Sequence, residues 1–174
     1  AGKKISLLDK RLKKIEKFVR VMPNMPALIG EGINCITSNS AINKSDKKNL
    51  NKLFNLSGKV IWLNNENQID MATAVSGSGP GFVFNIIDAM EKASLKLGFS
   101  KKISKLLVNY TFKGSISLLD QSNNSPEKLV SNVATKGGTT EAGIKIMNEN
   151  NLHKIFEKVL KSSYKRAKKQ SHTK

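Results

Sequence analysis

Residues 59–82 read KVIWLNNENQIDMATAVSGSGPGF, and the change of pattern inside this stretch decides the fold. Lys59 to Leu63 is a short run of β-branched and aromatic residues, which is typical of a strand. From Ile69 onward the spacing is helical, and residues 82–97 continue it with apolar side chains every three to four positions. The stretch therefore predicts that an α/β part ends near residue 66 and that a helical part begins there.

The residues before this change combine short strands with helical runs. We expect strands over 17–21 and 32–37 in addition to the one over 59–63. A helix is predicted over 45–54, with Ser45 as its N-cap and Gly58 beyond its end. Apolar positions 5, 8, 12 and 15 give residues 3–16 the spacing of a further helix. Strands and helices in this order indicate one edge of an α/β sheet.

A three-stranded sheet of this kind would be incomplete by itself. It would expose a long unpaired edge and one bare face. This is a physical reason, independent of any family, to expect that the chain is part of a longer protein.

The residues after 66 predict a series of helices. Ser100 opens the helix that follows Gly98. Ser125, Pro126 and Glu127 are a strong start signal, because they supply a capping hydroxyl, a proline in the first turn and an acid facing the helix dipole. A last amphipathic helix is predicted over 152–168, and the lysine-rich run 165–174 is expected to be a frayed basic tail.

Composition limits the class of protein. Of the 174 residues, 39% are hydrophobic and 25% charged, which favours a packed core over disorder. No run approaches the eighteen apolar residues of a membrane span, and the first ten residues lack the apolar region of a secretory signal. Cys35 is the only cysteine, so no intramolecular disulfide can form and we expect a buried thiol. Together these features predict a cytoplasmic protein.

The net charge of +17 raises the question of nucleic-acid binding. Only Arg11, Arg20 and Arg166 are arginines, whereas base readout relies on the bidentate guanidinium. Two tyrosines and one tryptophan are poor material for a stacking surface. We therefore expect a solvated basic surface with neither a nucleic-acid nor a membrane partner, and a basic nucleic-acid-binding domain stays a third alternative.

Two segments near the strands have the residues of a ligand site. Residues 20–26 read RVMPNMP, in which two prolines around Asn24 make a stiff turn at the end of a strand, where open α/β sheets bind ligands. Taken alone, an ordinary proline-rich turn explains this segment better. Residues 75–82, VSGSGPGF, lack the G-x-G-x-x-G spacing and the preceding strand of a dinucleotide-binding loop. They predict a helix start or kink, with serine hydroxyls that could face a ligand.

A third segment, residues 132–143, reads NVATKGGTTEAG. Its Gly-Gly pair runs into a helix that begins Thr-Thr-Glu, which presents free backbone N–H groups at the positive end of the helix dipole. Such an arrangement suits a carboxylate or a phosphate. A glycine turn with a threonine cap is an equally good interpretation of the segment by itself.

These segments together resemble one family. The MPN-x-P turn, the VSGSGP segment and the GGTT-x-AG loop occur in the order and at the spacing of pyrroline-5-carboxylate reductases, as does the AG at residues 1–2. The resemblance covers essentially the whole chain. It implies a mainly α fold, an α-helical dimerisation domain like the C-terminal domain of 6-phosphogluconate dehydrogenase, preceded by the last strands and helices of an α/β Rossmann domain.

The resemblance also implies domain limits and an activity. The remnant of the NAD(P)-binding Rossmann domain would cover 1–65, the helical dimerisation and substrate-binding domain 66–170, and a basic tail 171–174. The implied reaction is the reduction of 1-pyrroline-5-carboxylate to L-proline with NADPH or NADH, by a homodimer that could assemble further. Because most of the nucleotide-binding domain is missing, the fragment alone is expected to be inactive. The alternative is a non-catalytic helical dimerisation module.

The resemblance assigns roles to residues of this sequence. Thr140 is the implied catalytic residue, because its hydroxyl would reach the ring nitrogen while backbone N–H groups hold the substrate carboxylate. The implied substrate-binding residues are Glu66, Gly137, Gly138, Thr139 and Thr140, and the implied cofactor-binding residues are Ala1, Asn24 and Asn132. No metal is expected, since His153 and His172 have no second ligand at metal spacing.

Two residues depart from the pattern of the family. Lys136 replaces the usual proline before Gly137, which should loosen the loop and add positive charge beside a carboxylate site. Met25 stands where the family usually has threonine, which removes a polar group near the cofactor. These two residues put the activity in question, and the missing glycine-rich fingerprint does so more strongly.

Overall fold

The computed structural model describes residues 2–172, without the side chains of residues 9–11 and 172. Its residues form two compact units. The first comprises the described residues up to Phe82 and from Glu157 onward, and the second is Val83–Phe156. The chain passes from the first unit to the second inside helix α4 (Gly79–Lys96) and returns inside helix α8 (Leu152–His172). Within residues 2–172 no helix combines the length and apolarity that crossing a membrane requires.

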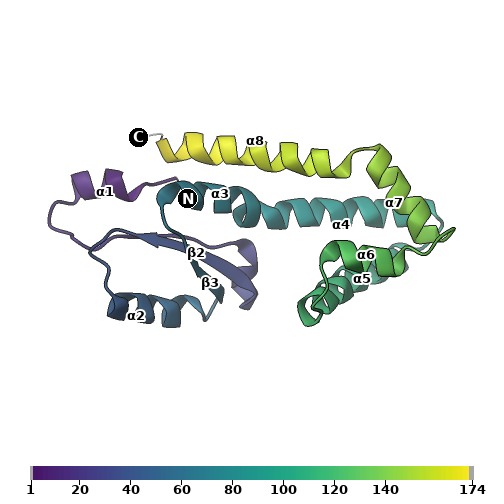
Figure 1. The fold of residues 1–174 in the computed structure, drawn as a ribbon, viewed down its shortest axis with the longest axis horizontal. Coiled ribbons are helices and arrows are strands. Elements are labelled where there is room, and N and C mark those ends of the chain that lie inside the picture. Colours follow the sequence, from purple (N-terminus) through teal and green to yellow (C-terminus); the bar gives the residue numbers. More distant parts are fainter. Residues whose placement is uncertain (1, 173–174) are drawn as a thin grey trace. The chain divides into compact units, whose positions relative to one another are not determined.

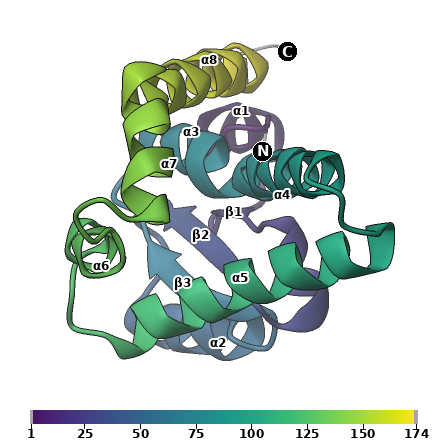
Figure 2. The same cartoon turned by 90° about the vertical axis from the view of Figure 1, so that its right-hand side faces the viewer.

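The first unit is a three-stranded sheet between helices. Strand β1 (Val19–Met22) is antiparallel to β2 (Gly32–Ser38), and β2 is parallel to β3 (Gly58–Trp62), in the order β1-β2-β3. Helix α2 (Lys44–Phe54) covers one face of the sheet and helix α3 (Glu66–Ala72) the other, as Figures 1 and 2 both show. The remaining elements are α1 (Ile5–Arg11), the 3-10 helix η1 (Met25–Ile29) and the π-helix η2 (Thr73–Gly77).

The core of this unit lies on the central strand. Ile36 of β2 and Ile69 of α3 have no exposed surface, and Cys35 of β2 is buried as expected. Helices on both faces explain why β2 is almost continuously buried. Gly58 has a φ of 140° and lies so close to β2 that a Cβ would collide with the backbone of Gly32. A glycine is therefore required where β3 begins.

The predicted mixture of an α/β remnant and a helical part is confirmed, and each predicted strand lies within two residues of an observed one. The start of α2 differs from the prediction. Asn43, and not Ser45, is the N-cap, because Asn43 and Asp46 form a reciprocal capping box. Lys17 also donates to Asp46, and this hydrogen bond lowers the pKa of the Asp46 carboxyl below its usual value.

Two helix lengths also differ from the prediction. Helix α1 stops at Arg11, because Leu12 leaves the helical conformation, and Leu12 and Ile15 are exposed where the predicted helix would have continued. Helix α8 continues to His172, so the expected frayed tail from residue 165 is wrong for the residues that the structure describes. Ala167 and Ser171 are buried, and their packing holds the last turns of α8 in place.

The second unit contains most of α4, helices α5 (Lys101–Gln121), α6 (Pro126–Val133) and α7 (Thr139–Glu149), and the first turn of α8. The predicted starts are confirmed, since the Ser100 hydroxyl accepts from the N–H of Ile103 and the Ser125 hydroxyl accepts from that of Lys128. Among residues 83–156 only Ser104 and Val108 are buried. This helical unit therefore has almost no core of its own.

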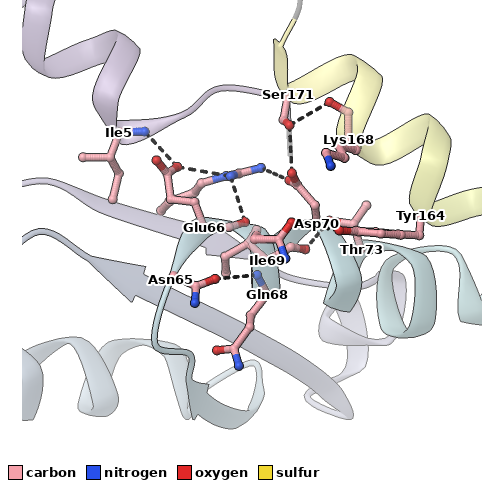
Figure 3. Close-up of polar contacts among 12 residues, drawn as sticks. Ile5, Asn65, Glu66, Gln68, Ile69, Asp70, Thr73, Tyr164, Lys168 and Ser171 are labelled. Atoms are coloured by element: carbon pink, nitrogen blue, oxygen red, sulfur yellow. Dashed lines mark hydrogen bonds and ion pairs between the residues drawn. The ribbon is translucent and has the colours of Figure 1, made fainter.

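Polar side chains tie α8 to α3 within the first unit. The Tyr164 hydroxyl donates to the side-chain oxygen of Asn67 at 2.8 Å, and the Ser171 hydroxyl donates to Asp70 Oδ2 at 2.8 Å. The other oxygen of Asp70 accepts from Arg20 Nη2 at 2.7 Å (Figure 3). One buried carboxylate thus joins β1, α3 and α8.

Replacing Asp70→Asn should destabilise the protein strongly. The amide cannot accept both the Ser171 hydroxyl and a charged hydrogen bond from Arg20, and it leaves the buried guanidinium with less compensation. We expect the free energy of unfolding to fall by about 3 kcal/mol in urea denaturation. Asp88→Asn, which removes an exposed ion pair with Lys92, is the control and should cost less than about 0.5 kcal/mol. Equal losses in the two variants would contradict this account of Asp70.

Candidate functional site

The Gly-Gly loop leads into α7 in the second unit. Gly137 has a φ of 74°, and Gly138 is the N-cap of α7 without any side-chain cap. The N–H of Gly137 donates to Glu141 Oε2 at 2.7 Å, and the N–H of Gly138 donates to the carbonyl of Thr135 at 2.9 Å. Both glycine N–H groups are therefore used to shape the loop, and Glu141 braces it from the first turn of the helix.

The next three N–H groups remain available. The helical bonds of α7 begin with the N–H of Ala142, which donates to the carbonyl of Gly138. Within residues 2–172, the N–H groups of Thr139, Thr140 and Glu141 have no hydrogen-bond acceptor. They lie at the positive end of the helix dipole, which is a suitable place for an anionic group. The threonine cap considered as an alternative is not formed, because Gly138 holds the capping position.

Two hollows flank this loop. An open one of about 590 Å³ is lined by Gly137, Gly138, Glu141, Ala142, Ile144, Lys145, Asn148 and Glu149. A second, of about 340 Å³, lies among α5, α6 and α7 and is mainly apolar; Thr140 lines it together with Leu119, Leu129 and Val133. Thr140 is half-buried, whereas Thr139 is exposed. The two threonines therefore have different surroundings.

Asn132 and Lys136 are exposed. Asn132 is in the last turn of α6, and Lys136 lies in the turn that leads to Gly137. The end of α6, the loop and the start of α7, which follow one another in Figure 2, thus span residues 132–140 and include Asn132, Lys136, Gly137, Gly138, Thr139 and Thr140. The structure keeps this predicted group together.

Three further predicted positions, Asn24, Met25 and Glu66, belong to the first unit. Asn24 caps η1, and its side-chain oxygen accepts from the N–H of Ile33 at 2.9 Å. This hydrogen bond ties the proline-rich turn to the start of β2. Met25 is 62% exposed, so the described part of the first unit leaves most of this residue, which replaces the usual threonine, uncovered.

Glu66 is the first residue of α3 and lies in a polar cluster. Its Oε1 accepts from the N–H of Ile5 at 2.9 Å and from Arg20 Nη1 at 3.1 Å (Figure 3). The carbonyl oxygen of Glu66 accepts from the same Arg20 nitrogen at 3.4 Å. No hydrogen bond between described residues joins Glu66 to Asn24. Ala1, the third predicted cofactor contact, lies outside the described residues.

The serine-rich segment is a kink, as predicted. It forms the π-helix η2, in which the N–H of Ser78 donates to the carbonyl of Thr73 at 2.9 Å. The hydroxyls of Thr73 and Ser76 donate to carbonyls one turn earlier, those of Ile69 and Ala72. A π-helix between two α-helices often marks a functional site.

The sequence pattern assigns no role to three residues of these clusters, Arg20, Asp70 and Glu141. Arg20 enters it only as one of three arginines and as part of the RVMPNMP segment. The sequence did contain a signal for Arg20. Glu66 and Asp70 are four residues apart on one helix and so lie on the same face, where two carboxylates favour a positively charged partner. Glu141 stands three residues after the N-cap, which is where a capping carboxylate is expected. The part of the chain that the structure describes holds no cluster of three or more metal-binding side chains.

The sequence of this chain is similar to one family of known proteins over nearly its whole length. Residues 66–170 match the model of the pyrroline-5-carboxylate reductase dimerisation family. The pyrroline-5-carboxylate reductase of Aquifex aeolicus is 34% identical over 97% of this chain and 63% of its own length. That of Pseudomonas aeruginosa is 34% identical over 96% of this chain and 61% of its own length. The chain thus spans less than two thirds of the length of these relatives.

Solved structures agree with the sequence comparison. A pyrroline-5-carboxylate reductase from Coxiella burnetii superposes with a TM-score of 0.94 at 34% identity, over 99% of this chain and 64% of that one. A pyrroline carboxylate reductase from Plasmodium falciparum with NADP bound gives a TM-score of 0.91 at 33% identity, over 98% of this chain and 67% of that one. The similarity therefore includes both units.

Gly137→Ala should distort the loop. No atom lies within 4 Å of a Cβ at this position, so the effect would come from the left-handed backbone alone. We expect a loss of about 1–2 kcal/mol in the free energy of unfolding. Gly137→Asn is the matched control, because asparagine tolerates this conformation better, and it should lose about half as much or less. If alanine were as stable as glycine in urea denaturation, the loop would not need its left-handed residue.

Proposed function

The chain belongs to the pyrroline-5-carboxylate reductase family, and we propose that the whole protein reduces 1-pyrroline-5-carboxylate to L-proline. The observation that carries the proposal is the start of α7, where three backbone N–H groups without acceptors follow the Gly-Gly turn, inside the region that matches the family. The substrate is a small carboxylate, which is the kind of group that such a helix start binds.

The reaction requires orientation more than acid–base strength. A reduced nicotinamide supplies the hydride when it is bound. The imine carbon accepts a hydride only when the ring nitrogen is protonated or hydrogen-bonded, and the ring must lie flat against the donor. Holding the carboxylate at one fixed point restricts how the ring can lie, so binding at the loop would contribute directly to the rate.

We assign the contacts of the substrate to the loop. The N–H groups of Thr139, Thr140 and Glu141 would hold the carboxylate, with Gly137 and Gly138 shaping the turn. The Thr140 hydroxyl would reach the ring nitrogen and keep it electrophilic. Lys136 adds a positive charge to the same loop, which would attract the carboxylate over a distance set by the ionic strength. Glu66 is a further proposed contact of the substrate.

The residues proposed as cofactor contacts would meet only one end of a nicotinamide cofactor. Asn24 lies in the turn that follows strand β1, and Asn132 lies in the last turn of α6; both are proposed contacts, as is Ala1. The sequence contains no G-x-G-x-x-G segment for the pyrophosphate, so this chain by itself should be inactive. We propose NADPH as the cofactor, with NADH as the alternative, because a relative is described with NADP bound.

We propose that a second copy of the chain covers the helical unit. We also propose that a helical dimerisation and substrate-binding domain comprises 66–170, after a Rossmann remnant over 1–65 and before a basic tail over 171–174. With only Val108 and Ser104 buried among residues 83–156, the helices expose a stripe on α5 formed by Ile103, Leu106, Leu107 and Tyr110. An apolar surface of this kind marks an interface. The match to a dimerisation family supports a homodimer. A single cysteine, buried and free, is compatible with the cytoplasm.

Oxidation of NADPH by the whole protein, expressed from its native start, tests the activity. We expect turnover with pyrroline-5-carboxylate, and Thr140→Ala should lower kcat/KM by about 10²- to 10⁴-fold because the ring nitrogen loses its hydrogen bond. Thr140→Ser keeps the hydroxyl and should stay within about tenfold of the unmodified enzyme. No turnover from a folded, dimeric whole protein would instead leave the non-catalytic dimerisation module as the explanation.

The double substitution Leu106→Lys and Tyr110→Lys should separate the subunits. Each buried apolar side chain contributes about 2 kcal/mol, and a two-fold interface contains each residue twice. We therefore expect dimer affinity to fall by at least about a thousandfold, to be measured by sedimentation equilibrium. Leu56→Lys is the control: it changes a residue of the first unit that is 81% exposed, and the sedimenting species should keep the molecular mass of a dimer. A dimer that survives the double substitution would place the interface elsewhere.

A further inference from the structure

Arg20 is a charged residue in an unusually buried position. Its side chain is 6% exposed, although it stands on β1 near the edge of a small sheet. It binds Glu66 Oε1 at 3.1 Å and Asp70 Oδ1 at 2.7 Å, two carboxylates one turn apart on α3. Burying such a group costs several kcal/mol before its partners compensate, and an apolar residue of similar size would often be as stable. Stability alone therefore does not explain why Arg20 is buried here, and its contacts indicate a role in holding neighbouring segments in place.

The carboxylate of Glu66 extends the contact to a third segment. The same Oε1 that faces Arg20 accepts from the N–H of Ile5, the first residue of α1 (Figure 3). The preceding residue, Lys4, is the N-cap of α1 and gives no side-chain cap. Glu66 therefore satisfies one of the N–H groups that the start of α1 leaves open, from a position 61 residues away in sequence. Ile5 itself is buried.

The three segments joined in this way carry the proposed contacts of the reaction. The segment before Ile5 leads to Ala1, β1 leads from Arg20 to Asn24, and α3 begins at Glu66. Because one Glu66 oxygen is shared by Arg20 and Ile5, that oxygen acts as a hydrogen-bond acceptor inside the protein. If Glu66 acts as this internal acceptor, its side chain needs an oxygen atom but not a negative charge. If Glu66 instead bound a positively charged imine directly, the negative charge would be required.

We propose that Arg20 is a positioning residue of the reductase site, which holds the Glu66 carboxylate against the N–H of Ile5 and so fixes the start of α1 relative to β1 and α3. This inference rests on the proposed function. It assigns to Arg20 a role that acts through Glu66, and it makes the internal hydrogen bond of Glu66, more than its charge, the feature that the enzyme requires.

The test compares four variants of the whole enzyme: Arg20→Lys, Glu66→Gln, Glu66→Ala and Lys17→Met. Lysine keeps the charge of Arg20 but has no planar fork to bind two carboxylates at once. Glutamine keeps an oxygen that can accept from Ile5 and Arg20, and alanine removes it. Lys17→Met is the matched control, since it removes an exposed ion pair with Asp46 just before the same strand. The readouts are kcat and KM for both substrates, and hydrogen exchange of residues 2–11.

We expect Arg20→Lys and Glu66→Ala to lower kcat/KM by about tenfold or more, Glu66→Gln to lower it clearly less than Glu66→Ala does, and Lys17→Met to stay within about threefold of the unmodified enzyme. Exchange over residues 2–11 should accelerate in the first two variants only. Combining Arg20→Lys with Glu66→Ala should add little to either loss, because both act through one contact.

Two results would overturn the proposal. A loss in Glu66→Gln as large as that in Glu66→Ala, with exchange unchanged, would show that the substrate needs the negative charge. Activity and exchange unchanged in Arg20→Lys would show that the guanidinium positions nothing. If Arg20→Lys does not fold, the two Glu66 variants decide the matter by themselves. Absence of turnover in the unmodified enzyme would instead refute the proposed function, while the exchange experiment would still test the link from Arg20 to Ile5.

Discussion

The guanidinium of Arg20 lies in the interior of the first unit, between Glu66 and Asp70, and much of that unit is organised around it. Asp70 extends the cluster to Ser171 near the end of α8, and Glu66 extends it to Ile5 at the start of α1. Residues from both ends of the described chain thus meet one strand through two carboxylates. Because a buried charge is tolerated only with its partners in place, the cluster specifies a single arrangement of these segments.

The helical unit follows a different physical rule. Its helices α5 and α6 have the predicted serine caps, yet among residues 83–156 only Ser104 and Val108 are buried. Local signals are sufficient to make helices, but a stable domain must remove apolar surface from water. The proposed second copy of the chain would supply that burial.

The Gly-Gly loop, which we propose as the substrate site, leaves three backbone N–H groups without acceptors among residues 2–172. Gly137 supplies the left-handed turn, Gly138 leaves the capping position without a side chain, and Glu141 braces the turn from within the helix. The geometry of the helix then fixes the position and direction of the backbone N–H groups that remain. Such donors need no reorganisation when a carboxylate arrives, which is the advantage of backbone groups over flexible side chains.

Sequence alone determined the change from α/β to helical structure near residue 66, the helix starts at Ser100 and Ser125, the kink at the serine-rich segment and the family, because these depend on local pattern and spacing. It misplaced the N-cap of α2, extended α1 beyond Arg11 and expected α8 to fray, since competing caps and burial decide where helices end. Tertiary structure alone decided that Arg20 meets Glu66 and Asp70, and that Ser171 closes the same cluster. These contacts join residues 46 to 101 positions apart, and no local periodicity encodes a partner at that separation.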